Sequence, residues 1–287
     1  SRLMTGLLTG ISARKIGCSY FIDLRDIFSE SISELFSRKN QILGGVSKTV
    51  FSFLEGKLFN NAAGVNVVSE GFYDYFQKEG IDTSNWSFFP NGVDQEFTNV
   101  VINKDVASKK VKTILYAGNI GSGQGLDFVL PDIAKKLGND YHFLVIGDGG
   151  KRVILEEKIN HKNLDNVKVL PPVSRPQLID YYKNADILFL HLNNIPAFSR
   201  VLPSKIFEYA ALGKPIMAGL SGYSAKFLKK NIPYAAVFDP GNADQCINFI
   251  KKSESIKIDK DTIDIFIKEY AREKIMKKMA THILKLV

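Results

Sequence analysis

Two short segments of the chain carry residue types that could hold an anionic ligand. The first, GNIGSGQG at 118–125, places four glycines in eight residues directly after the apolar run 112–117. Glycine lets the backbone turn sharply and approach a ligand closely, and a following helix would offer unpaired N–H groups to an anion. We therefore predict a phosphate cradle at this turn, with a tight strand-to-helix turn as the alternative. The spacing matches neither a P-loop nor a clean G-x-G-x-x-G.

The second segment, PSKIFEYAALGKP at 203–215, has the signals of a short helix with a charged first turn. Proline suits the first position of a helix, and Gly213 would end it. Ser204 and Lys205 fall in the first turn, where N–H groups and an ammonium could meet a diphosphate. Glu208 follows one turn later, where its carboxylate could accept two hydrogen bonds from a ribose diol. A surface helix with an ordinary Lys–Glu pair is the alternative.

A repeating strand–helix pattern would position both segments. From Val111 onward, strand-length apolar runs alternate with helix-like segments. This rhythm is typical of a parallel sheet covered by helices on both faces, in which ligands sit beyond the carboxyl ends of the strands. The predicted strands are 112–117, 141–146, 167–170, 186–191, 215–218 and 235–238, and the predicted helices are 124–137, 151–160, 175–184, 204–212, 223–230 and 242–252.

The first third of the chain gives a shorter version of the same pattern. Three strands make an incomplete sheet, so we expect that further sequence precedes Ser1. The segment 98–111 is polar and patternless and is interpreted as a linker. We predict an N-terminal domain over 1–103 and a C-terminal domain over 104–264, with a helix at about 265–287 that could pack back on the first domain. The predicted elements of the first third are strands at 19–24, 65–68 and 86–89 and helices near 3–15, 41–60 and 70–79.

Length, charge and composition bound the class of protein. The 287 residues suit about two domains, and a hydrophobic content of 45% excludes wholesale disorder, collagen and a disulfide scaffold. The net charge of +8 comes from basic residues that are scattered rather than interleaved with aromatics, which argues against nucleic acid as a partner. Cys18 and Cys246 match no metal or redox spacing, and no apolar run approaches the length of a membrane span.

Five stretches, in this order along the chain, resemble the retaining glycosyltransferases of family 4, which have the GT-B fold. DLRDIF at 23–28 resembles the bacterial branch that builds surface polysaccharides, including L-fucosamine and colanic-acid-type transferases. The resemblance implies an α/β protein with two Rossmann-like parallel-sheet domains facing a cleft and an incomplete N-terminal domain. The other stretches are PNGVDQEF at 90–97, YAGNIGSGQGL at 116–126, VIGDGGKRVILEE at 145–157 and PSKIFEYAALGKPI at 203–216.

The resemblance also implies a donor, a nucleoside-diphosphate sugar held mainly by the C-terminal domain, with a UDP-sugar expected. Glu208 occupies the place of the family's ribose-binding glutamate, and Ser204 and Lys205 occupy the places that give N–H groups to the diphosphate. The implied substrate-binding residues are Gly118, Asn119, Gly121 and Gln124 in the glycine turn, Asp148 and Gly149 bordering the base pocket, Val173 at the base, and Pro203, Ser204, Lys205 and Glu208.

Two departures from the family pattern bear on catalysis. The first glutamate of the family's Glu-x7-Glu motif falls at Arg200, and the Arg and Lys that often clamp the diphosphate are replaced by Asn119 and Gln124. Charge compensation would then come from Lys205, Arg200 and the helix N-terminus. We therefore assign Lys205 and Arg200 as the catalytic candidates, with N–H groups of Gly121 and Ser204 assisting. The implied mechanism needs neither an enzymic nucleophile nor a metal.

The remaining candidates have competing structural explanations. His191 ends a predicted strand, so it is either a sugar contact or a satisfied strand-end histidine. The segment 41–60 has apolar residues at helical spacing, which suits core packing or a helix lying on a membrane. Asp23, Arg25 and Asp26 are candidates for the acceptor side or the cleft wall.

These observations predict a transferase that moves a sugar, with retention, from a nucleotide sugar to a lipid-linked or oligosaccharide acceptor in surface polysaccharide synthesis. No metal site, no cofactor beyond the donor and no nucleic acid are predicted, and the chain is expected in the cytoplasm, with possible contact with the inner membrane face. A non-catalytic nucleotide-binding scaffold and, less favoured, a nicotinamide-dependent oxidoreductase are the alternatives. The oxidoreductase has support from the glycine turn and Asp148 but leaves PSKIFEY without a role.

Overall fold

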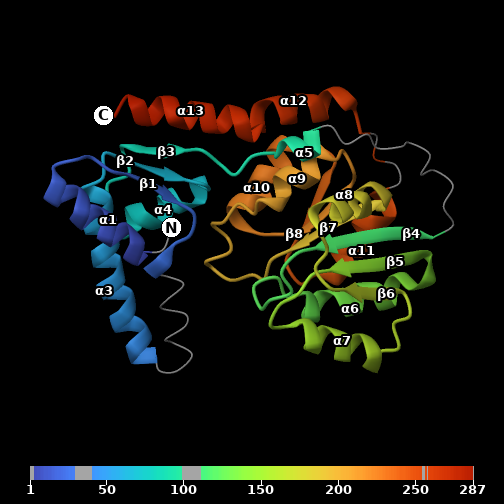
Figure 1. The fold of residues 1–287 in the computed structure, drawn as a ribbon. Coiled ribbons are helices and arrows are strands. Elements are labelled where there is room, and N and C mark those ends of the chain that lie inside the picture. The colour runs from blue at the N-terminus through green and yellow to red at the C-terminus, as the bar shows by residue number, and fades with distance from the viewer. Residues whose placement is uncertain (1–2, 30–40, 99–110, 254–255, 257, 287) are drawn as a thin grey trace. The chain divides into compact units, whose positions relative to one another are not determined.

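A computed structural model describes residues 3–29, 41–98, 111–253, 256 and 258–286, except for the side chains of 41–44 and 46–48. The chain divides into two compact units (Figure 1). The N-terminal unit comprises residues 1–91, 200–202 and 273–287, and the C-terminal unit comprises 92–199 and 203–272. The predicted boundary at 103/104 and most of the predicted linker lie outside the described residues, so the domain division stays a prediction.

The N-terminal unit contains a parallel three-stranded sheet in the order β1-β2-β3. Its core gathers apolar residues from the strands and from the helices on either side, among them Ile22, Val65 and Phe76. The described elements are α1 (Leu3–Ile16), β1 (Phe21–Leu24), α3 (Gln41–Asn60), β2 (Gly64–Val67), the short 3-10 helix η1 (Glu70–Phe72), α4 (Tyr73–Lys78), β3 (Trp86–Phe88) and, from Glu273 on, α13 (Arg272–Leu284).

Helix α3 places the segment 41–60 in the N-terminal unit. Leu58 and Phe59 are buried in the core and Leu54 packs against it, whereas Val50 and Phe53 are exposed. Core packing therefore accounts for the end of this helix, while the side chains of residues 41–44 and 46–48 at its start lie outside the described ones. None of the described helices is both long enough and apolar enough to cross a membrane.

The C-terminal unit contains a parallel six-stranded sheet in the order β6-β5-β4-β7-β8-β9. This is the doubly wound order, in which the chain changes direction between β4 and β7 and ligands bind at the carboxyl ends of those strands. The elements are α5 (Gln95–Thr98), β4 (Lys112–Ala117), α6 (Leu126–Leu137), η3 (Gly138–Asp140), β5 (Tyr141–Ile146), α7 (Arg152–His161), β6 (Val167–Leu170), α8 (Arg175–Asn184), β7 (Ile187–His191), α9 (Lys205–Ala211), β8 (Ile216–Gly219), α10 (Gly222–Asn231), β9 (Ala235–Phe238), α11 (Ala243–Lys252) and α12 (Lys260–Tyr270).

Both faces of the large sheet are covered. This was expected from the sequence, because the strands carry apolar residues on both faces. Ile114 and Tyr116 of β4 join a buried cluster with α6 and α11, while the intervening Leu115 and Ala117 are buried on the opposite face. The predicted α/β class with two parallel sheets is confirmed. Strands β4, β5, β6 and β9 match their predicted bounds residue for residue.

The predicted C-terminal helix, at about 265–287, is interrupted in the structure. Ala271 has extended backbone angles and separates α12 from α13. Val93 donates its N–H to the carbonyl of Tyr270 at 2.7 Å and accepts from the N–H of Arg272 at 2.9 Å. In an uninterrupted helix the Tyr270 carbonyl and the Arg272 N–H would be paired within the helix. Their hydrogen bonds to Val93 therefore account for the break at Ala271.

Candidate functional site

The carboxyl end of β4 leads into a turn whose backbone is packed as closely as glycine permits. Gly118 and Gly147 both have φ near +150°, and a Cβ atom on Gly147 would lie 1.8 Å from the carbonyl oxygen of Gly118. A Cβ atom on Gly149 would lie 2.6 Å from the carbonyl oxygen of Ile120. The turns after β4 and β5 are thus in direct backbone contact, which no side chain at these positions would allow.

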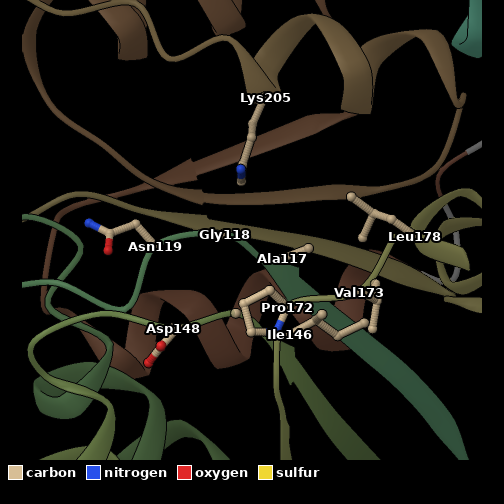
Figure 2. Close-up of a pocket in the computed structure, with 10 residues that line it drawn as sticks. Ala117, Gly118, Asn119, Ile146, Asp148, Pro172, Val173, Leu178 and Lys205 are labelled. Carbon is tan, nitrogen blue, oxygen red and sulfur yellow. The ribbon is translucent and has the colours of Figure 1, made fainter. Parts of the chain in front are cut away.

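A pocket of about 300 Å³ opens at these two turns (Figure 2). The ammonium of Lys205 extends from the start of α9 toward Gly118, and a Cβ atom there would lie 2.7 Å from Nζ. The pocket has a polar end and an apolar end, which suits a ligand that joins a charged group to a flat ring. Its lining residues are Ala117, Gly118, Asn119, Ile146, Gly147, Asp148, Pro172, Val173, Leu178 and Lys205.

The structure thus brings together five of the residues predicted from the sequence to bind the donor: Gly118, Asn119, Asp148, Val173 and Lys205. Sequence reasoning did not single out Gly147, Pro172 or Leu178. Gly147 had a signal, because it begins the Gly-Asp-Gly sequence that follows β5. No sequence signal marked Leu178, because a leucine at an apolar position of a helix is normally interpreted as a core residue.

The start of α9 positions three of the predicted residues. Pro203 and Ser204 precede the helix, and Ser204 makes no capping hydrogen bond with its side chain. Burial lowers the pKa of Lys205, while the nearby carboxylate of Glu208 acts in the opposite direction. Lys205 is the basic side chain among the residues that line this pocket, so it is the group available there to offset a ligand's negative charge.

Glu208 lies one turn along α9 and is outside the pocket lining. The hydroxyl of Tyr182, a fully buried residue of α8, donates to Glu208 Oε2 at 3.4 Å. Burial raises the pKa of Glu208, and the positive charges of Lys205 and Arg175 partly oppose that shift. A carboxylate with one hydrogen-bond donor retains acceptor capacity for a diol.

An amide pair stands where the family often has cations. Asn119 Nδ2 donates to Gln124 Oε1 at 3.0 Å, and the N–H of Gly121 donates to the same oxygen at 3.2 Å. The predicted diphosphate donor Gly121 is thus paired with an amide oxygen in this structure.

Asp148 and Gly149 form the turn after β5. Gly149 donates its N–H to Asp148 Oδ1 at 2.8 Å, and Ile120 donates its N–H to the Asp148 carbonyl at 2.7 Å. The backbone of Asp148 therefore holds the glycine turn after β4, while its exposed carboxylate lies at the polar end of the pocket (Figure 2). Its predicted place beside the base stays a prediction.

His191 ends β7 and is fully buried. Its Nδ1 lies 2.6 Å from the carbonyl oxygen of Gln124, and its Nε2 accepts from the N–H of Gly241 at 2.9 Å. Both ring nitrogens are therefore engaged by the protein. This favours the alternative of a satisfied strand-end histidine over a sugar contact.

Arg200 belongs to the N-terminal unit, whereas Lys205 belongs to the C-terminal unit. The guanidinium carbon of Arg200 lies 4.8 Å from the ring centroid of Tyr75, and the Arg200 carbonyl accepts a hydrogen bond from the hydroxyl of Ser69. A cation over an aromatic face is attracted by the ring's negative face. Its predicted catalytic role stays a prediction.

The three acceptor-side candidates lie after or at the end of β1 in the N-terminal unit. Arg25 pairs with Asp23 at 2.9 Å and donates to Asn91 Oδ1 at 3.2 Å, while Asn66 Nδ2 donates to Asp23 Oδ1 at 2.8 Å. Asp23 and Arg25 also line a second pocket of about 310 Å³. Asp26, the next residue in the chain, is exposed and does not line that pocket.

No group of three or more His, Cys, Asp or Glu side chains in the described part of the chain is placed to hold a metal ion. The predicted independence of a metal is not tested by this observation. The two cysteines are free thiols: Cys18 is exposed and Cys246 is buried in the core of the C-terminal unit.

Comparison with known structures assigns the fold. Anabaena Alr3699/HepE, solved in complex with UDP, superimposes with a TM-score of 0.78 over 99% of this chain and 77% of that chain, at 16% identity. The sucrose-phosphate synthase of Thermosynechococcus elongatus gives 0.76 over 99% and 72%, at 15% identity. The two parallel sheets are those of the GT-B fold.

Comparison of sequences gives the family. Residues 99–273 match the model of the glycosyl transferases group 1, and the chain belongs to this family. The "Putative colanic acid biosynthesis glycosyl transferase WcaI" of Escherichia coli K12 is 28% identical over 178 residues, covering 59% of this chain and 44% of that protein. The 2-deoxystreptamine N-acetyl-D-glucosaminyltransferase of Niallia circulans is 26% identical over 175 residues, covering 60% and 42%. The aligned part of the chain thus spans less than half the length of these relatives.

Proposed function

We propose that the chain is the donor-binding part, with a portion of the acceptor side, of a retaining glycosyltransferase that uses a nucleotide sugar. One observation carries this proposal. The chain belongs to the glycosyl transferases group 1. Its Lys205 ammonium and the glycine turn at Gly118 line one pocket, which lies at the carboxyl ends of the strands where the strand order of the sheet reverses. That place is where parallel α/β sheets bind phosphorylated ligands.

The donor is proposed to be a UDP-sugar. The solved Anabaena protein binds UDP, and a second structure of it holds UDP-glucose. The pocket of this chain has an apolar end at Val173 and Leu178 that suits a base, and a cationic side chain that suits a diphosphate. The acceptor is proposed to be a lipid-linked or oligosaccharide one in surface polysaccharide synthesis. The similarity to a protein named for colanic acid biosynthesis supports the polysaccharide part of this proposal.

The proposed reaction breaks the bond between the anomeric carbon and the diphosphate oxygen. A new bond forms to the acceptor hydroxyl on the same face, and the hydroxyl proton passes to the departing diphosphate. Lys205 and the N–H groups of Gly121 and Ser204 would stabilise the charge that develops on the leaving group, because fixed donors need no reorganisation as the charge grows. Glu208 would anchor the ribose, and Arg200 is the second candidate cation.

Calorimetric titration of the chain with UDP, GDP and NAD, each with and without magnesium, tests this proposal. UDP binding that does not require magnesium is the expected result. Binding of NAD alone would replace the proposal with an oxidoreductase. UDP binding by a complete protein that transfers no sugar would favour the non-catalytic scaffold.

Replacing Glu208 by glutamine is expected to weaken UDP binding by roughly tenfold. Hydrogen bonds to a charged group contribute about 1.5–3 kcal/mol, and the glutamine amide keeps one acceptor oxygen. Titration calorimetry measures the change. A UDP affinity equal to that of the unsubstituted protein would show that Glu208 does not hold the ribose.

The same carboxyl group predicts a dependence of UDP binding on pH. Burial raises the pKa of Glu208 above its ordinary value of 4.5, so the carboxylate is lost as pH falls through that raised pKa. UDP affinity is therefore expected to fall on acidification at a higher pH than an exposed glutamate would cause. UDP affinity is measured for wild type and Glu208→Gln from pH 8 down to about 5. The ionisation of UDP itself affects both proteins equally, so it cancels in the difference between the two affinities. A difference that is constant across this range would contradict the prediction.

A further inference from the structure

The end of β7 is connected by hydrogen bonds to the turn that follows β4. His191 meets the carbonyl of Gln124, and the N–H of Asn193 donates to the carbonyl of Gly123 at 2.8 Å. The amide of Asn193 also donates to the carbonyl of Ser122. The carbonyl groups of residues 122, 123 and 124 are therefore all hydrogen-bonded by residues at or just after the carboxyl end of β7.

The partners of His191 define which ring nitrogen carries the proton. The N–H of Gly241 can only donate, so Nε2 must be the acceptor and the proton must be on Nδ1. Nδ1–H then donates to the carbonyl of Gln124. Burial lowers the pKa of His191, which keeps the imidazole in this neutral form, and the backbone contact with Gln124 acts in the opposite direction.

The surroundings of His191 fix the ring in place. Its plane is stacked parallel to Phe189 at 6.4 Å between centroids, and Phe238 lies 6.1 Å away. A Cβ atom on Gly219 would lie 2.3 Å from the ring, so only glycine leaves room for it. The imidazole is thus a rigid bridge between the turn after β4 and the turn after β9.

Gln124 connects His191 to the glycine turn beside the pocket. Its side-chain oxygen accepts from the Asn119 amide and from the N–H of Gly121. With its carbonyl held by His191, Gln124 has both its backbone and its side chain engaged in shaping the glycine turn. Asn119 itself lines the pocket.

We propose that His191 is a positioning residue for diphosphate binding: it holds Gln124, and through Gln124 it orients the turn from Asn119 to Gly121. This inference rests on the proposed function. It assigns His191 a role through the protein rather than a contact with the sugar. The diphosphate is the part of the ligand that would sense the turn, whereas the nucleoside would not.

The test compares UDP with uridine, which lacks the phosphates, in variants of His191. His191→Phe keeps a ring between the same aromatic neighbours but cannot donate to Gln124. His191→Asn places an amide N–H near the position of Nδ1, and His191→Gln reaches toward Nε2 instead. His142→Phe, near the start of β5, is the matched control because His142 is a partly buried histidine in the same sheet.

We expect His191→Phe and His191→Gln to lose about tenfold in affinity for UDP and to bind uridine unchanged. His191→Asn should bind UDP within about threefold of wild type, and His142→Phe should bind both ligands normally. Thermal unfolding of each variant checks that it is folded, and if His191→Phe is not, the Asn and Gln variants still carry the comparison. A general structural role would weaken UDP and uridine alike and would overturn the inference.

Two other outcomes separate this inference from the proposed function. Unchanged UDP affinity in all His191 variants would overturn the positioning role while leaving the donor site in place. A wild-type protein that binds no UDP would overturn the proposed function and this inference with it.

Discussion

Replacing Lys205 by alanine is expected to weaken UDP binding about a hundredfold, the largest loss for any single side chain of the site. The ammonium extends toward the glycine turn in a partly buried pocket, where a charge-assisted bond to phosphate contributes up to about 3 kcal/mol. Titration calorimetry with UDP measures the loss. Uridine, which lacks the phosphates, should bind the variant as it binds wild type.

Lys230→Ala is the matched control for this experiment. Lys230 is an exposed lysine near the end of α10 in the same unit, and its removal changes the net charge by the same amount. Surface charges separated from a ligand by more than a Debye length are largely screened. Equal losses in the two variants would mean that UDP senses the overall charge of the protein rather than the ammonium in the pocket.

Replacing Gly147 by alanine is expected to destabilise the protein by about 3 kcal/mol and to weaken UDP binding more than tenfold. The new Cβ atom would lie 1.8 Å from the carbonyl oxygen of Gly118, and φ at this position is +152°. A residue forced into such backbone angles costs about 1–3 kcal/mol, and the clash adds to that cost by moving one of the two turns. Thermal unfolding and UDP titration measure the two effects.

Gly150→Ala, three residues further along the same turn, is the control. Nothing lies within 4 Å of a Cβ atom there, and the position does not have a left-handed backbone. The substitution should leave stability within about 0.5 kcal/mol of wild type. A Gly147→Ala protein as stable and as tight-binding as this control would show that the close contact of the two turns is not needed.

The sequence predicted most of the large sheet because each strand is encoded locally. The runs at 112–117 and 141–146 are apolar on both faces, and each is followed by glycine and then asparagine or aspartate, so their ends could be assigned without knowledge of their partners. The break at Ala271 could not be predicted in this way. It depends on the backbone of Val93, which lies far away in the sequence.

The candidate site shows the same division. Gly118, Asp148 and Lys205 were predicted because strand ends and a helix start mark them in the sequence. The surroundings of His191 were not predictable, because its two partners lie 67 and 50 residues away along the chain. The surroundings of Arg200 likewise depend on Ser69 and Tyr75, which belong to a different part of the chain.

The bridge between Val93 and Ala271 determines how this protein can be dissected. It joins the segment before β4 to the break after α12, and Asp94 beside it pairs with Arg175 and with Arg272, the latter at 2.8 Å. A fragment cut at residues 104 and 264 removes both sides of the bridge as well as Asp94 and Arg272. The two ends of the C-terminal unit therefore pair with each other, and an excised version of this unit has to begin before Val93 and run past Arg272.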